Sequence, residues 1–174
     1  SVPVADAGSN EEIACSVTSF TLGGSTSSTG ASIDYLWTTL DGLIDSDPTL
    51  ATITVSTPGT YVLTVSDNSS GCASSDNVVV TLNNSLPVAD AGIDGVLTCS
   101  ILNLQLDGSA SDIGATIDYA WSTSDGNMTS ATNLSTVSID QPGTYTLTVL
   151  NTDNGCSAFD DVVVTQNNTS PIAD

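Results

Sequence analysis

The fold can be worked out from Pro58-Gly59-Thr60-Tyr61-Val62-Leu63-Thr64-Val65, which returns 84 residues later as Pro142-Gly143-Thr144-Tyr145-Thr146-Leu147-Thr148-Val149. Pro-Gly favours a turn, and the residues that follow alternate as they do in a β-strand. Tyr61, Leu63 and Val65 fall on one face of that strand. Only this face is fully kept in the second copy, because Thr146 replaces Val62 on the other face. The conserved face is therefore predicted to line a core.

The whole chain of 174 residues repeats with the same period. From Pro3 onward, each residue compared with the one 84 places later gives 40 identities in 84 positions without a gap. A fixed period indicates duplicated structural units, and a unit of this size can bury a modest core of its own. We predict two domains, residues 1–86 and 87–170, with residues 171–174 opening a third repeat.

Each repeat shows short strand patterns between turns and no helical periodicity, which predicts an all-β fold. In the first repeat the expected strands are residues 12–15, 19–22, 33–37, 52–55, 61–65 and 76–82. Asp41-Gly42 and Asp125-Gly126 predict tight turns after the third strand of each repeat. The aromatic side chains expected in the two cores are Tyr35, Trp37, Tyr61, Tyr119, Trp121 and Tyr145.

The charge is entirely of one sign. The chain has 20 Asp and Glu and no Lys, Arg or His. Nothing can neutralise phosphates, so we expect no nucleic-acid partner. Without an apolar run of 18 residues, we expect no membrane insertion. Catalysis is not expected either, because a Ser or Cys nucleophile lacks its usual base and the aromatic residues that a glycosidase cleft needs are assigned to cores.

Three stretches of the sequence resemble a known family. Asp34 to Gly42, with Trp37 and Asp41-Gly42, and Pro58-Gly59-Thr60-Tyr61 resemble PKD-type immunoglobulin-like domains, as does the opening Ala5-Asp6-Ala7-Gly8. A tyrosine that opens a strand after a turn is also similar to the tyrosine corner of such sandwiches. The resemblance implies two tandem Ig-like (PKD-like) β-sandwiches joined end to end.

The cysteines extend the resemblance. Ser70-Gly71-Cys72 and Asn154-Gly155-Cys156 are similar to repeats of giant surface adhesins of gliding bacteria. This implies a non-catalytic repeat module of an extracellular bacterial filament or adhesin stalk. Its partners would be neighbouring repeats of the same chain and like chains in a fibre. The alternative is a glycan- or protein-binding module that accompanies a secreted enzyme.

Four cysteines at equivalent positions predict disulfides and an oxidising exterior. Two pairings are open. The first bonds Cys15 to Cys72 and Cys99 to Cys156, and it is favoured because each repeat carries its own pair. The second bonds Cys15 to Cys156 across the two repeats. The expected topology speaks for the second, since Cys15 lies near the first turn and Cys72 at the far end of its domain.

Acidic side chains without cationic partners supply the oxygen ligands that Ca²⁺ prefers. We expect no certain cofactor, but a Ca²⁺ site between the repeats is a hypothesis, with simply solvated carboxylates as the alternative. The candidate ligands are Glu11, Glu12, Asp41, Asp45, Asp107, Asp112 and Asp153.

Overall fold

The computed structural model describes residues 1–169, so the predicted start of a third repeat lies outside the described residues. The chain divides into two compact units, Ser1–Asn84 and Ser85–Asp174. All regular structure among the described residues is β-strand, as the sequence predicts. Each unit contains one four-stranded and one two-stranded sheet, which makes two tandem Ig-like sandwiches.

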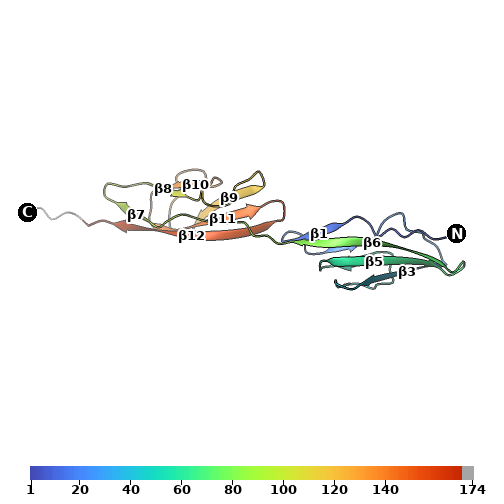
Figure 1. The fold of residues 1–174 in the computed structure, drawn as a ribbon. Coiled ribbons are helices and arrows are strands. Elements are labelled where there is room, and N and C mark those ends of the chain that lie inside the picture. The colour runs from blue at the N-terminus through green and yellow to red at the C-terminus, as the bar shows by residue number, and fades with distance from the viewer. Residues whose placement is uncertain (170–174) are drawn as a thin grey trace, which may run out of the picture. The chain divides into compact units, whose positions relative to one another are not determined.

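In unit 1 the four-stranded sheet has the order β1-β6-β5-β3, and β2 pairs with β4 in the second sheet (Figure 1). The strands are β1 (Glu11–Ala14), β2 (Phe20–Leu22), β3 (Ile33–Thr39), β4 (Ile53–Val55), β5 (Gly59–Asp67) and β6 (Cys72–Asn83). The Pro58-Gly59 turn leads directly into β5, which forms an antiparallel hairpin with β6. The strand that carries Tyr61 is therefore an inner strand of its sheet.

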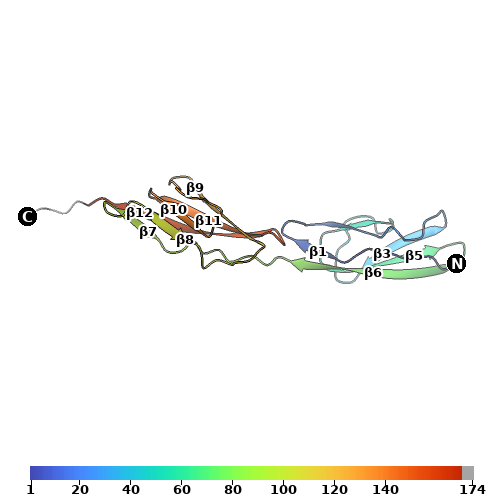
Figure 2. The same cartoon turned by 90° about the horizontal axis from the view of Figure 1, so that it is seen from above.

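Unit 2 repeats this arrangement, with the orders β7-β12-β11-β9 and β10-β8 (Figure 2). Its strands are β7 (Gly95–Thr98), β8 (Leu104–Asp107), β9 (Ile117–Thr123), β10 (Thr136–Ile139), β11 (Gly143–Asn151) and β12 (Cys156–Asn167). The twelve-residue last strand of each unit is longer than the sequence predicts at both ends. In unit 1 the first residues of this strand, Cys72 to Ser75, are small, but they pair fully with the preceding strand, as Cys156 to Phe159 do in unit 2.

The first strand of each unit runs parallel to the last one. Glu11 to Ala14 pairs in register with Val80 to Asn83 at the end of β6. The segment before β1 follows β6 in the same direction, because Ala7 N–H donates to Asp76 and Val79 N–H donates to Asn10. The chain therefore enters unit 1 near the start of β6 and leaves it at the end of β6.

Each unit has its own core. The two clusters of buried residues contain no member from the other unit. Trp37, Tyr61, Trp121 and Tyr145 are at most 4% exposed and lie between the sheets. Tyr35 and Tyr119 are half-buried and pack against the margins of the two cores.

Candidate functional site

The tyrosine at the start of β5 fastens the loops of unit 1. The Tyr61 hydroxyl donates to the Thr57 carbonyl oxygen at 2.8 Å and accepts the Leu43 N–H at 3.2 Å. Leu43 N–H also donates to Thr57 Oγ1 at 2.7 Å. The fully buried ring thus carries a polar group that joins the Asp-Gly turn to the turn before β5. This is the bonding expected of a tyrosine corner.

The Asp-Gly turn fits against this tyrosine. Asp41 Oδ1 accepts the Thr60 N–H at 2.8 Å, and Gly42 N–H donates to Thr39 Oγ1 at 2.9 Å. A Cβ atom on Gly42 would stand 2.4 Å from the Tyr61 hydroxyl oxygen. Glycine is needed here because the tyrosine occupies the space of a side chain. The two sequence motifs therefore form one hydrogen-bonded arrangement, which we call the tyrosine lock; in unit 1 its residues are Thr39, Asp41, Gly42, Leu43, Thr57, Thr60 and Tyr61.

Unit 2 builds the same lock with one difference. The Tyr145 hydroxyl donates to the Gln141 carbonyl oxygen at 2.6 Å and accepts the Asn127 N–H at 3.1 Å. Gln141 replaces the threonine that gives Leu43 its second acceptor in unit 1. Burial raises the pKa of Tyr145, with the carboxylate of Asp140 nearby adding to the effect.

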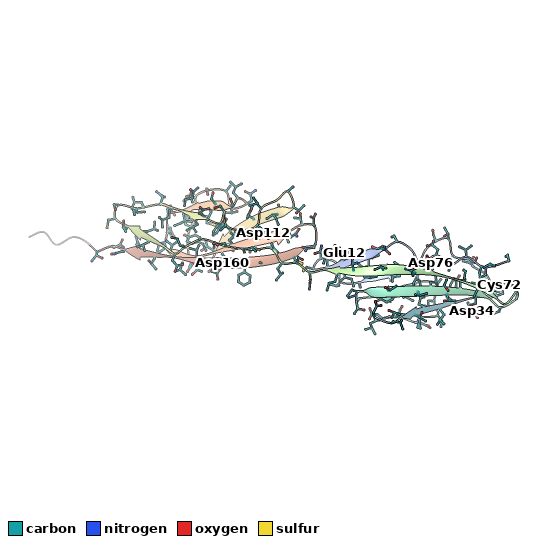
Figure 3. The ribbon with its side chains drawn as sticks, viewed as in Figure 1. Glu12, Asp34, Cys72, Asp76, Asp112 and Asp160 are labelled. Carbon is teal, nitrogen blue, oxygen red and sulfur yellow. The ribbon has the colours of Figure 1, made fainter. Side chains whose placement is uncertain are left out.

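One aspartate in each unit, which sequence reasoning missed, bonds the last strand to the segment before the first strand. Asp76 Oδ2 accepts the Ala7 N–H at 2.8 Å, and Asp160 Oδ2 accepts the Ala91 N–H at the same distance. Each aspartate is on the same face of the last strand as its buried valines. Figure 3 shows the two aspartates on β6 and β12. An acidic residue at an inward position in both repeats is a signal that could have revealed this role.

Several other aspartates are bonded to nearby hydroxyl and N–H groups. The side-chain hydroxyl of Ser69, followed by that of Ser70, lowers the pKa of Asp67. The Ser109 side chain and N–H lower the pKa of Asp107 in the same way. Asp6 and Asp47 have lowered pKa values through neighbouring threonines. The hydrogen bonds donated to these carboxylates favour their charged form, which is why the pKa values are lowered.

The candidate calcium ligands have varied surroundings within their own units. Asp41 is bonded to the Thr60 N–H, and Glu12 accepts from the Asn83 amide. Asp112 accepts the Val88 N–H. Among residues 1–169 there is no group of three or more Asp, Glu, Cys or His side chains that could hold a metal ion. The calcium site remains a prediction; its other candidates are Glu11, Asp45, Asp107 and Asp153.

The cysteines correct one prediction. Cys15 and Cys156 are disulfide-bonded, whereas Cys72 and Cys99 are free thiols. The favoured pairing of Cys15 with Cys72 and of Cys99 with Cys156 is therefore wrong. The oxidised pair agrees with the alternative, Cys15 with Cys156.

The parallel first and last strands explain why the pairing within a repeat fails. Cys72 is the first residue of β6, while Cys15 follows Ala14, which pairs with Asn83 at the other end of β6. The eleven steps between the first and last of its twelve residues, at about 3.3 Å each, separate these ends by ~36 Å. A disulfide requires Cα atoms within about 7 Å of one another. Figure 3 shows Cys72 and Glu12 at opposite ends of β6.

Exposed apolar groups are scattered over the described surface. Phe159 is 72% exposed on β12, although most aromatic residues were expected in the cores. A surface hollow of about 470 Å³ in unit 1 is lined by Thr38, Thr39, Leu40, Asp41, Thr60 and Val62, without an aromatic side chain. In residues 1–169, no helix has the length and apolarity that crossing a bilayer requires.

Comparisons with known proteins agree with this architecture. Residues 84–166 match the PKD domain family. A mouse (Mus musculus) protein named Dyslexia-associated protein KIAA0319-like protein is 37% identical over 130 residues. These residues are 68% of this chain but 12% of the mouse protein, so the chain spans a small part of that relative's length.

Solved structures with similarity include titin domains I67–I69 in an E-to-A variant and the PKD domain of the KIAA 1837 protein. The titin structure is 13% identical, with 96% of this chain and 64% of that chain covered and a TM-score of 0.46. For the PKD domain the identity is 27%, the coverage 49% and 92%, and the TM-score 0.38. PKD and Ig-like domains that carry a disulfide are typical of extracellular proteins. Residues 84–166 thus match the PKD domain family, and the repeated strands and tyrosine locks make the chain a tandem of two Ig-like sandwiches.

Proposed function

We propose that this chain is a structural, non-catalytic repeat module of an extracellular bacterial filament or adhesin stalk. Its partners are neighbouring repeats of the same chain and like chains in a fibre. The sequence duplication and the two separate cores support this proposal, because each unit is a complete building block.

The observation that carries the proposal is the path of the chain through each unit. The segment before β1 and β1 itself follow β6 from its start to its end, so the two chain ends of unit 1 lie at opposite ends of the sandwich. In unit 2, the bonds from Ala91 to Asp160 and from Val163 to Asp94 repeat this path. A unit of this kind adds its length to a chain of repeats, which is what a stalk requires.

The surface charge supports a structural role outside the cell. With 20 acidic and no basic side chains, neighbouring stalks repel each other and remain soluble. Divalent cations can bridge such acidic surfaces. The proposed Ca²⁺ site between repeats would be one such bridge.

The test is to express chains with increasing numbers of this two-repeat unit and to measure their length by electron microscopy and small-angle scattering. A stalk module predicts that length rises in proportion to the number of repeats. A particle whose radius grows only as the cube root of its mass contradicts the proposal, since the repeats would then collapse together.

A second candidate is a glycan- or protein-binding module that accompanies a secreted enzyme. The exposed Phe159 favours it, because a flat apolar ring on a sheet face can stack against a sugar or another side chain. The first repeat has Ser75 at the same position, which gives the chain its own control. Saturable binding on a glycan array that Phe159→Ser abolishes would favour this candidate over the stalk.

A further inference from the structure

The strand β8 of unit 2 has one edge without a strand partner among residues 1–169, because it pairs with β10 alone. On β10, the Ser138 N–H donates to Ser130 Oγ and the Ser138 carbonyl oxygen accepts the Thr129 N–H, so the main chain of Ser138 faces away from β8. Gln105 lies opposite Ser138 in this antiparallel ladder. Main-chain groups face the partner strand at every second residue, so those of Gln105 and Asp107 point to the unpaired edge.

This edge faces an open groove. Gly92, with a φ of +85°, passes so close to β8 that a Cβ atom would stand 2.7 Å from the Asp107 carbonyl oxygen. The chain then crosses to the other sheet, where Asp94 Oδ1 accepts the Val163 N–H at 2.9 Å. The crossing leaves a hollow of about 270 Å³, the β8 groove, lined by Gly92, Ile93, Asp94, Gly95, Leu104, Gln105, Leu106 and Asp107.

The main-chain groups that face the β8 groove are open to a further strand. In the described part of the chain, no main-chain hydrogen bond joins residues 92–95 to β8. The side chains of β8 alternate, with Leu106 buried and Gln105 and Asp107 exposed. An added strand would therefore meet an apolar side chain on one face and polar or acidic side chains on the other.

The lining of the β8 groove is particular to unit 2. Ile93, Asp94, Gly95 and Asp107 stand where unit 1 has Ser9, Asn10, Glu11 and Gly23. Ile93 is 91% exposed, and both aspartates are exposed. Unit 2 thus combines an exposed apolar side chain, two carboxylates and an unpaired strand edge, whereas unit 1 lacks the first two at these positions.

We propose that the β8 groove binds an extended segment of another protein in which cationic and apolar side chains alternate. The segment adds as a strand to the free edge of β8 and pairs with the main chain of Gln105 and Asp107. Its apolar side chains pack beside Leu106 and Ile93. Its Lys or Arg side chains lie on the other face, where the carboxylates of Asp94 and Asp107 attract them.

The charge of this chain indicates where the segment comes from. With 20 acidic side chains and no Lys, Arg or His, a second copy would bring further carboxylates against Asp94 and Asp107. A cationic segment of a different protein is instead attracted by the whole chain, which speeds its encounter with the groove. This inference goes beyond the stalk function and does not depend on it.

The experiment measures amide hydrogen exchange by NMR in the full two-repeat chain with a capped probe peptide, Lys-Val-Lys-Val-Lys. Strand addition should slow exchange at Gln105 and Asp107, because their N–H groups become hydrogen-bonded. Thr21, which takes the place of Gln105 in repeat 1, should exchange at an unchanged rate. Lys-Gly-Lys-Gly-Lys, which has the same charge without apolar groups, and Glu-Val-Glu-Val-Glu should leave all three rates unchanged.

Two variants copy repeat 1 into the groove. Ile93→Ser should weaken binding of the Lys-Val peptide about tenfold, as expected for the loss of one buried apolar side chain. Asp94→Asn should reduce the salt dependence of the affinity. The fold should tolerate it, because Asn10 accepts the Val79 N–H just as Asp94 accepts that of Val163. Phe159→Ser, which removes an exposed ring outside the groove, is the matched control and should leave the affinity unchanged.

Four results would overturn the proposal. Unchanged exchange at Gln105 and Asp107 in millimolar Lys-Val peptide would show that no strand is added. Equal slowing by the Lys-Gly peptide, or equal slowing at Thr21, would show attraction by charge alone. Slowing at Gln105 and Asp107 when the chain is concentrated without peptide would make a second copy the occupant of the groove.

Discussion

The clearest test of the tyrosine lock is to remove its hydroxyl group in each repeat. Tyr61→Phe leaves the Thr57 carbonyl oxygen without its 2.8 Å donor, but the Leu43 N–H keeps Thr57 Oγ1 as an acceptor. A net loss of about 1 kcal/mol per hydrogen bond and 1–3 kcal/mol for a buried group left unsatisfied predicts roughly 2 kcal/mol less stability for repeat 1.

Tyr145→Phe should lower the stability of repeat 2 by more than Tyr61→Phe lowers that of repeat 1. It removes the donor to the Gln141 carbonyl oxygen and also the acceptor of the Asn127 N–H. Among the hydrogen bonds of residues 1–169, no second acceptor for this N–H takes over the role that Thr57 plays in unit 1. One further unsatisfied group adds about 1 kcal/mol, so we expect roughly 3 kcal/mol for repeat 2.

The assay is urea unfolding followed by tryptophan fluorescence, since each repeat contains a single tryptophan. Trp121→Phe leaves Trp37 as the reporter for repeat 1, and Trp37→Phe leaves Trp121 for repeat 2. With a slope of about 1 kcal/mol per molar urea for a small domain, the midpoints should move by roughly 2 M and 3 M.

Tyr35→Phe is the matched control. Its hydroxyl donates only to the Ser28 carbonyl oxygen, and the side chain is half-buried, so water can replace the lost group. We expect a cost of less than about 1 kcal/mol. Equal costs for all three variants, or a smaller cost for Tyr145→Phe than for Tyr61→Phe, would refute the assignment of stability to these bonds.

Four other expectations follow from the structure. Gly126→Ala places a Cβ 2.3 Å from the Tyr145 hydroxyl oxygen and should destabilise repeat 2 by about 2 kcal/mol through overpacking, while Gly114→Ala, whose Cβ meets Ile117 at 3.7 Å, should be harmless in the same thermal unfolding assay. Because burial raises the pKa of Tyr145, the stability of repeat 2 should be complete below the unfolded pKa of about 10 and fall as pH rises beyond it; Tyr145→Phe should weaken this alkaline loss. Raising ionic strength from about 0.01 M to about 1 M should increase the melting temperature, because it shortens the screening length from ~30 to ~3 Å and relieves repulsion among 20 acidic groups; an unchanged value would show that this repulsion is negligible. If Ca²⁺ binds between the repeats, a tenfold excess over its dissociation constant should stabilise the chain by about 1.4 kcal/mol relative to chelator, and no shift in calorimetry at any Ca²⁺ concentration would end that hypothesis.

The strand that carries Tyr61 could be predicted because its pattern is local. Alternation with period two marks Tyr61, Leu63 and Val65 as inward, and all three are completely buried. Trp37 follows from the same reasoning on the preceding strand of the sheet. These are cases where neighbouring residues alone determine which side chain faces the core.

The cysteine pairing and the carboxylate roles depend on residues far apart in the sequence. The sequence predicts a last strand that begins at residue 76, but β6 begins at Cys72 because Cys-Ala-Ser-Ser pairs with β5 despite its weak strand propensity. That extension carries Cys72 away from Cys15. The Asp76 bond to Ala7 spans 69 residues, so local patterns show an inward acid but not its partner.

The parallel pairing of β1 with β6 has a mechanical consequence. When tension pulls the two ends of a module apart, it slides β1 and β6 past each other along their axes. The ladder from Glu11–Val80 to Ala14–Asn83 is then loaded in shear, with all its rungs sharing the force, rather than opened one rung at a time like a zipper. A module built in this way resists mechanical rupture better than one whose end strands separate one rung at a time.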